Sequence, residues 1–81
     1  MAINKQTTED YRVIDLTGGD YTSEKGKYFL VDAGVGGDIV YVSPITGLDV
    51  TVTVPDSYVG IYYTEIVRQA GTTASNLIAI Y

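Results

Sequence analysis

The sequence predicts an all-β fold, namely a single small antiparallel β-sandwich or β-barrel of about six to eight strands. Apolar and polar residues alternate along much of the chain, and clusters of Gly, Pro and Asp interrupt the alternation at intervals of about ten residues. Regular turns at this spacing are typical of sandwiches and barrels. No segment shows the apolar spacing of an amphipathic helix.

The clearest strand is residues 50–54, where valine and threonine alternate. Both residue types are β-branched and favour a strand, and the alternation predicts that Val50, Val52 and Val54 face the core. Pro55 ends this strand because proline cannot donate a hydrogen bond to a neighbouring strand. The similar pattern of residues 38–42 and 49–53 predicts that these two segments form the two arms of one hairpin.

Five further segments complete the predicted set of strands. They are residues 11–17, 27–31, 39–43 and the two runs on either side of the Gly71-Thr72-Thr73 turn. From the last two runs we expect Ile66, Ile78 and Ile80 in the core. The final residues are strongly apolar, whereas most domains finish in a few loose polar residues, so we expect the last strand to lie inside a sheet.

The chain divides into a polar arm, residues 1–10, and a single β-domain, residues 11–81. The arm shows no periodicity and has too little apolar surface to fold by itself. We expect it either to stay flexible or to become ordered along a neighbouring subunit, with Ile3 as its main contact. Extended, ten residues reach about 30 Å.

Composition limits the function. The chain has 81 residues, no cysteine and no histidine, so disulfides and the usual zinc sites are absent. The net charge of −5, without a cluster of Lys or Arg, argues against binding to nucleic acid or to anionic membranes. We find no signal peptide and no apolar run long enough to span a bilayer, and therefore expect a soluble product made in the cytoplasm. A small domain without covalent reinforcement often associates with copies of itself.

Two features could be mistaken for ligand sites. Gly34-Val35-Gly36-Gly37 follows a strand, but a phosphate-binding loop needs a helix or a lysine behind it, so we interpret these glycines as a hairpin loop with positive φ. Four aspartates near strand ends could converge on calcium, yet their spacing fits no calcium loop, and turn aspartates that bond their own backbone explain them better. These are Asp32, Asp38, Asp49 and Asp56. We predict no metal and no cofactor.

Catalysis has little support in the sequence. Without His or Cys, an active site would need paired carboxylates, a lysine with a shifted pKa or a Ser or Thr with a base. The serines fall in predicted turns, and Glu65 and Arg68 are three apart on a strand and point to opposite faces. We predict that the protein is not an enzyme.

Eight tyrosines are the unusual part of the composition. Tyrosine suits positions that are apolar on one side and in contact with water on the other, and it is enriched at interfaces. We nevertheless expect most of these rings to be ordinary half-buried residues of the sheet. Tyr62 and Tyr63 are adjacent and must face opposite ways, so one of them lies on the outer surface or under a partner. The predicted interface residues are Ile3, Tyr62, Tyr63 and Tyr81.

The carboxyl-terminal segment, residues 65–81 (EIVRQAGTTASNLIAIY), resembles the ending of small virion proteins of tailed phages and gene transfer agents. The segment 49–55 (DVTVTVP) and the glycine-rich loop before Asp38 are also similar to these proteins. The likeness covers roughly the last fifty residues and does not include the first thirty.

The resemblance implies a head-associated structural protein on the exterior of the capsid. It would be either an oligomeric decoration (cement) protein or the base of a head spike or fibre at the capsid vertices. The expected partners are further copies, as a homotrimer or homopentamer, the major capsid protein, and a spike or fibre protein. A small carbohydrate-binding β-module is the alternative from another class, suggested by the tyrosines and the acidic turns.

Overall fold

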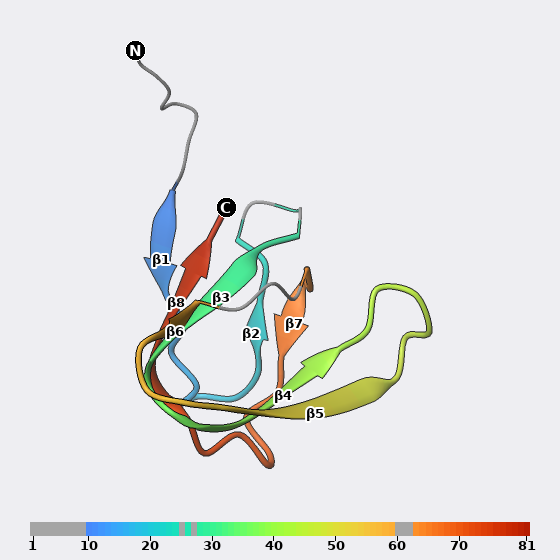
Figure 1. The fold of residues 1–81 in the computed structure, drawn as a ribbon. Coiled ribbons are helices and arrows are strands. Elements are labelled where there is room, and N and C mark those ends of the chain that lie inside the picture. The colour runs from blue at the N-terminus through green and yellow to red at the C-terminus, as the bar shows by residue number, and fades with distance from the viewer. Residues whose placement is uncertain (1–9, 25, 27, 60–62) are drawn as a thin grey trace.

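The structure, a computed structural model, describes residues 10–24, 26, 28–59 and 63–81 and confirms the all-β prediction. Eight strands form two four-stranded antiparallel sheets, so of the two predicted architectures the fold is the sandwich (Figure 1). The strands are β1 (Tyr11–Val13), β2 (Tyr21–Thr22), β3 (Leu30–Val35), β4 (Gly37–Val42), β5 (Asp49–Val54), β6 (Tyr58–Val59), β7 (Ile66–Val67) and β8 (Ser75–Ile80).

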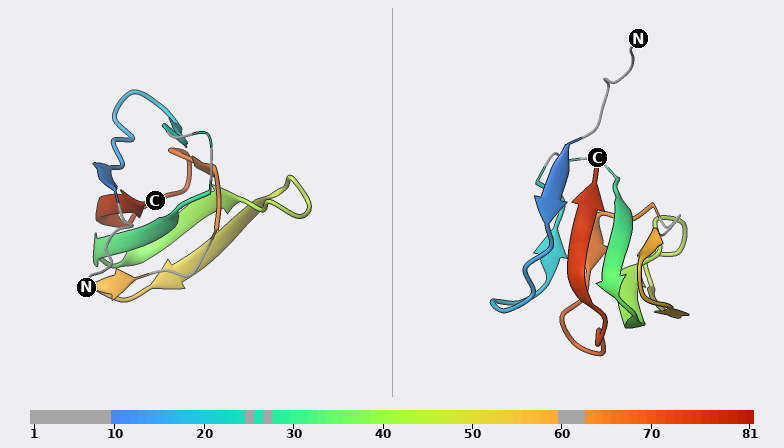
Figure 2. Two further views of the ribbon diagram at one scale, coloured as in Figure 1. Left: turned by 90° about the horizontal axis from the view of Figure 1, so that it is seen from above. Right: turned by 60° about the vertical axis from the view of Figure 1, so that its left-hand side comes forward.

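Sheet A has the strand order β1-β8-β3-β6, and sheet B has the order β2-β7-β4-β5. Among the described strands, only β4 and β5 follow each other within one sheet, and the other connections cross between the sheets (Figure 2). The predicted hairpin is confirmed, with Val40 opposite Thr51. Strand β8 lies between β1 and β3, which confirms that the last strand is inside a sheet.

A long two-stranded ribbon bends from sheet B into sheet A. Strands β4 and β5 pair at one end of the ribbon, β3 and β6 pair at the other, and only Gly36 separates β3 from β4. The N–H of Gly36 donates to Asp56 Oδ1 at 2.7 Å, which joins the two strands at the bend. The predicted hairpin loop at residues 34–37 is therefore wrong, because the glycines form a corner between sheets. Gly37 does have the expected positive φ, 149°.

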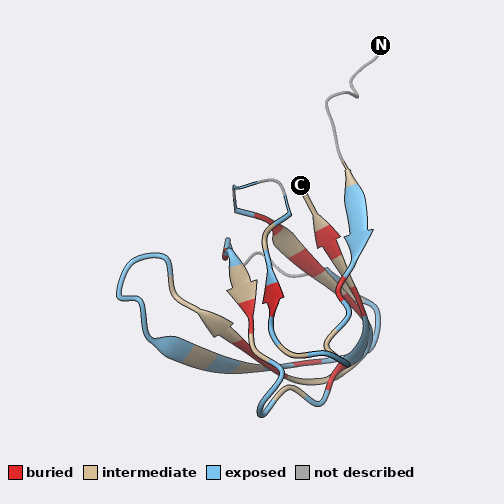
Figure 3. Ribbon diagram, turned by 180° about the vertical axis from the view of Figure 1, so that it is seen from behind, coloured by how far each residue is buried: buried red, intermediate tan, exposed pale blue. Residues whose placement is uncertain are grey.

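The core lies between the two sheets. Its members come from both sheets and from the connecting segments (Figure 3). The buried hydrophobic residues of this cluster are Ile14, Tyr21, Phe29, Val31, Ala33, Ile39, Val54, Val67, Ala74, Leu77 and Ala79. The predicted inward face of residues 50–54 is correct, since Val54 is buried and Val52 packs against the cluster, while Val50 is half-buried.

In β8 the predicted inward face was wrong. Leu77 and Ala79 are buried, and Ile78 and Ile80 lie on the opposite face. All four residues are apolar, so the sequence pattern cannot choose between the two faces. The choice is made by the pairing with β3, whose buried Ala33 and Val31 lie opposite Leu77 and Ala79.

Strand β7 shows the same error, because the core residue is Val67 and not Ile66. Val67 lies opposite both Tyr21 of β2 and Tyr41 of β4, which fixes it on the inner face of sheet B.

Three strand boundaries also differ from the prediction. The first strand ends at Val13, where Ile14 turns into the core, and the second extends later than predicted, as Leu30–Val35. Strands β2 and β6 were not predicted because two residues are too few to show an alternation.

Thr64 is the buried polar residue among the described positions. Its Oγ1 lies 2.8 Å from the carbonyl oxygen of Val42 and accepts from the N–H of Ile66 at 3.1 Å. Its backbone exchanges N–H···O bonds with Phe29, at 3.0 and 3.3 Å. A buried hydroxyl without partners would be costly, so these bonds account for a polar residue at this depth and tie the β6–β7 connection to both sheets.

Candidate binding surface

Two of the four predicted interface residues are described by the structure. Tyr63 is 60% exposed and remains available to a partner. The ring of Tyr81 packs on Phe29 with the ring centroids 5.4 Å apart, so it supports the fold, and its interface role stays a prediction. Ile3 and Tyr62 lie outside the described residues, as does the predicted arm except for Asp10.

An aromatic cluster joins Tyr81 to the core. The hydroxyls of Tyr21 and Tyr81 are 2.7 Å apart, and the N–H of Glu24 donates to the Tyr81 hydroxyl at 2.9 Å. Tyr21 also packs edge-on against Phe29, with the ring centroids 5.3 Å apart. Burial, followed by the hydrogen bond with Tyr81, raises the pKa of the Tyr21 phenol well above its ordinary value of 10.0. These rings are structural, since their polar atoms bond one another.

This raised pKa predicts a loss of stability in alkali. The unfolded chain gives up the Tyr21 proton above about pH 10 while the folded chain keeps it, so the free energy of unfolding falls as the pH rises through that region. We expect the free energy of unfolding of Tyr21→Phe to fall less steeply than that of the wild type between about pH 9 and 11, measured by urea denaturation. At about pH 7 the variant should show only the loss of the hydrogen bonds of the Tyr21 hydroxyl, about 1 kcal/mol for each. Equal slopes for the two proteins above pH 10 would contradict the assignment.

The outer face of sheet A is unusually apolar. Residues opposite each other in an antiparallel pair point to the same side. The pairing of Tyr11 and Leu30 with Ile80, and of Val13 with Ile78, therefore places all five on one face. We call this surface the apolar face of sheet A; its outward residues are Tyr11, Val13, Leu30, Asp32, Val59, Ile78 and Ile80.

The apolar face of sheet A is open to solvent. Tyr11 is 65% exposed and Val13 is 69% exposed, and every residue of β1 is exposed (Figure 3). Single exposed apolar residues are normal, but contiguous apolar patches mark interaction sites.

The apolar face of sheet A contains one charged side chain, that of Asp32. Asp32 of β3 is opposite Ile78 on one side and Val59 on the other. With Tyr11 and Ile80, these residues line a shallow hollow of about 510 Å³. The carboxylate takes no part in the ion pairs between described residues. Because a charge buried without a partner is costly, a molecule that covers this face needs a cation or a hydrogen-bond donor opposite Asp32.

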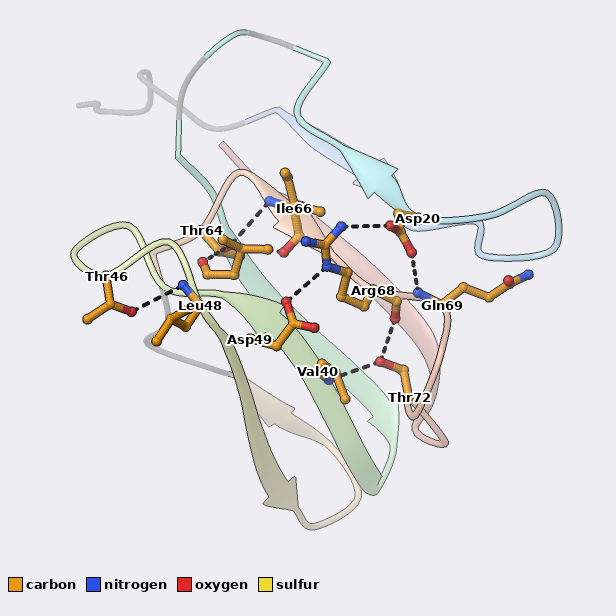
Figure 4. Close-up of polar contacts among 11 residues, drawn as sticks. Asp20, Val40, Thr46, Leu48, Asp49, Thr64, Ile66, Arg68, Gln69 and Thr72 are labelled. Atoms are coloured by element: carbon orange, nitrogen blue, oxygen red, sulfur yellow. Dashed lines mark hydrogen bonds and ion pairs between the residues drawn. The ribbon is translucent and has the colours of Figure 1, made fainter.

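The outer face of sheet B carries a polar network. Arg68 donates to Asp49 Oδ1 at 3.0 Å and to Asp20 Oδ2 at 2.9 Å, which links β7 to β5 and to the start of β2 (Figure 4). The two carboxylates raise the pKa of Arg68, and the bonds from Gln69 N–H and from Arg68 lower the pKa of Asp20. The groups of this network bond one another, so we assign it to the stability of sheet B.

The aspartates do not behave as the sequence predicted. Asp32, Asp38 and Asp49 lie within strands, so their interpretation as turn residues is wrong. Asp38 accepts from Thr53 Oγ1 at 2.6 Å, and Asp56 bonds Gly36 across the ribbon and not its own turn. Among the described residues, no group of three or more acidic side chains is placed to hold a metal ion.

A second hollow of about 510 Å³ lies between the β1–β2 and β7–β8 connections. Two of its polar side chains bond within the chain. Gln69 Nε2 donates to the carbonyl oxygen of Leu16 at 2.6 Å, and Thr72 Oγ1 donates to the carbonyl oxygen of Arg68 at 2.7 Å.

One signal in the sequence could have located the apolar face. Residues 77–80 are four consecutive apolar residues, whereas a strand with one face in water alternates. A continuous apolar run in a strand indicates that both faces are covered. One face of β8 covers the core, and in the described structure the other is open.

Comparison of the chain with models of known protein families, with curated protein sequences and with solved structures finds no significant match. The described residues contain no helix with the length and apolar character needed to cross a membrane.

Proposed function

We propose that this chain is a non-enzymatic structural protein of a tailed-phage virion that decorates the outside of the capsid. The apolar face of sheet A is the observation that carries the proposal, because it combines exposed apolar side chains from neighbouring strands in one contiguous surface. The resemblance of residues 65–81 to head-associated proteins supports the capsid as that partner. The base of a spike or fibre at the vertices is the second form of the same role.

The charge of Asp32 defines the partner further. Two copies joined through this face would bring two Asp32 carboxylates into one apolar interface, where like charges repel. A different protein with apolar residues around one Lys or Arg fits better. We therefore propose the major capsid protein as the occupant of the apolar face, with a cation placed opposite Asp32.

The test measures how many copies of the protein remain on particles purified from cells that carry the gene. Mass spectrometry should find hundreds of copies per particle for a decoration protein and some tens for a spike base. Val13→Lys places a charge in the proposed interface and should lower the number of bound copies at least about tenfold. The matched control is Ile45→Lys, which makes the same change of charge at the tip of the β4–β5 hairpin and should bind like the wild type. No copies of the wild type on particles, or equal numbers for both variants, would overturn the proposal.

A carbohydrate-binding module is the second candidate. Tyr11 and Asp32 line the same hollow, and an aromatic ring beside a carboxylate is a pair that can hold a sugar. Binding to a glycan array that is lost in Asp32→Asn would favour this candidate. The capsid proposal predicts no such binding.

A further inference from the structure

The β5 edge of sheet B is a second surface that no described segment covers with a further strand. Strand β5 is six residues long, and among the described strands it pairs with β4 alone. Natural proteins usually protect a long edge strand with a lysine, a proline, a bulge or a covering loop. Within β5 none of the first three occurs, and the pairing with β4 runs without interruption from Val54 to Asp49.

The backbone groups on this edge can be assigned from the neighbouring bonds. Val40 donates its N–H to Thr72 Oγ1 at 2.9 Å and accepts at its carbonyl oxygen from the N–H of Arg68 at 2.7 Å. Both groups therefore point away from β5, so Val40 and Thr51 form a non-hydrogen-bonded pair of the antiparallel ladder. The N–H and carbonyl oxygen of Thr51 must then point outward, to the free edge.

The same reasoning applies at both ends of β5. The backbone groups of Asp38 bond Thr73, and the carbonyl oxygen of Val42 accepts from Thr64 Oγ1 at 2.8 Å. The backbone N–H and carbonyl groups of their partners in β5, Thr53 and Asp49, consequently also point to the free edge. Three alternate residues thus present backbone donors and acceptors along one edge.

The inward side of β5 is also incompletely covered. Val50 and Val52 are only half-buried, although they lie on the core side of sheet B. The β4–β5 hairpin projects away from the rest of the sandwich (Figure 1, Figure 2), and its tip carries the exposed Ile45 and Leu48. A strand added to this edge would satisfy the outward backbone groups and shelter the valines.

We propose that β5 pairs with β5 of a second copy across a twofold axis, so that the two copies of sheet B form one continuous antiparallel sheet. Thr51 lies opposite Thr51 of the second copy, and Asp49 lies opposite Thr53. In this register the three residues whose backbone groups point to the free edge lie opposite one another in the two copies. Each such pair exchanges both backbone hydrogen bonds. The valines meet one another on the inner face, Val50 opposite Val52.

The sequence of β5 favours a copy of itself in this register over the neighbouring ones. A shift centred on Val52 would place Asp49 opposite Pro55, which has no N–H to donate. A shift centred on Val50 would place Thr53 opposite Gly47, which lies outside β5, so the outward backbone groups of Thr53 would lose their partner. A shift centred on Asp49 would place the two aspartates directly opposite each other, where like charges destabilise the pair. The inference goes beyond the proposed function, and it predicts a dimer instead of the trimer or pentamer expected from the resemblance.

Sedimentation equilibrium of the full chain and of two variants tests the proposal. The wild type should be a dimer. Thr51→Pro removes only an N–H that faces solvent in the single copy, a position where an edge strand tolerates proline, and should weaken the dimer at least about 30-fold. Thr51→Lys brings two cations together at the axis and should have a similar effect. Thr22→Lys, on the opposite edge of sheet B, is the matched control and should remain a dimer.

A cross-linking experiment tests the register. The chain has no cysteine, so Thr51→Cys introduces a unique thiol. A short bifunctional thiol reagent should join two copies of Thr51→Cys and should not join two copies of Thr22→Cys. A wild-type monomer, a trimer or pentamer, or a dimer that persists in both Thr51 variants would overturn the proposal. Val13→Lys separates the two proposals, because it should lose capsid binding and remain a dimer.

Discussion

Replacing Phe29 with alanine should lower the free energy of unfolding by about 3–5 kcal/mol. Phe29 is the chain's one phenylalanine and is 1% exposed. Its ring contacts Tyr21 and Tyr81, and its backbone pairs with Thr64, so it joins four segments of the chain. Truncation leaves a cavity that these rigid neighbours cannot fill.

The size of this effect decides whether the variant folds. Small domains have about 0.05–0.15 kcal/mol of stability per residue, so a loss of this size removes much of the total. Urea denaturation should show a strongly lowered midpoint or an unfolded chain. Tyr28→Ala is the matched control, since the neighbouring ring is half-exposed and its loss should change stability by less than about 0.5 kcal/mol. Similar losses for the two variants would contradict the position assigned to Phe29.

The predictability of the strands depended on how clearly one face was polar. In residues 50–54 threonine marks the outer face, and the predicted inner valines are correct. In β8 both faces are apolar, so Ile78 and Ile80 could not be told from Leu77 and Ala79 until the pairing with β3 was known. Large apolar residues are usually buried, and this general preference misled the choice.

The candidate binding surface could not be predicted for a related reason. It combines residues from β1, β3, β6 and β8, which are far apart in the sequence and adjacent only through the strand order of sheet A. Tyrosine count indicated an interface in general terms, but the tyrosine that the structure places on this face is Tyr11, which was not among the predicted interface residues. The sequence places Asp32 near the end of a strand, but in the structure it lies in the middle of the apolar face of sheet A.

The corner at Gly36 was missed because a sequence does not state which strands share a sheet. Glycine after a strand fits both a hairpin and a bend, and local reasoning favoured the commoner hairpin. In the structure the required property is close approach. A Cβ built on Gly36 would lie 2.5 Å from the carbonyl oxygen of Val54 and 2.6 Å from the carbonyl carbon of Pro55.

Gly36→Ala should therefore lower the free energy of unfolding by at least about 3 kcal/mol, the upper range for overpacking. The atoms that the new methyl group meets are backbone atoms of the opposing strand, which cannot rotate away as a side chain can. To relieve the contact, the ribbon must open at its bend, and this movement would break the bond from the Gly36 N–H to Asp56. The pairing of β3 with β6 begins just beyond the bend, so the disturbance should spread into sheet A.

Thermal denaturation followed by circular dichroism measures this loss. Gly18→Ala is the control, because a Cβ there meets no atom within 4 Å and needs no left-handed backbone, so the variant should melt within about 2–3 °C of the wild type. Gly47→Ala separates strain from crowding: its site is open, but its φ of 76° should cost about 1–2 kcal/mol. The expected order of stability is Gly18→Ala, then Gly47→Ala, then Gly36→Ala. If Gly36→Ala melted with Gly18→Ala, the two strands could not approach as closely at the corner as the structure places them.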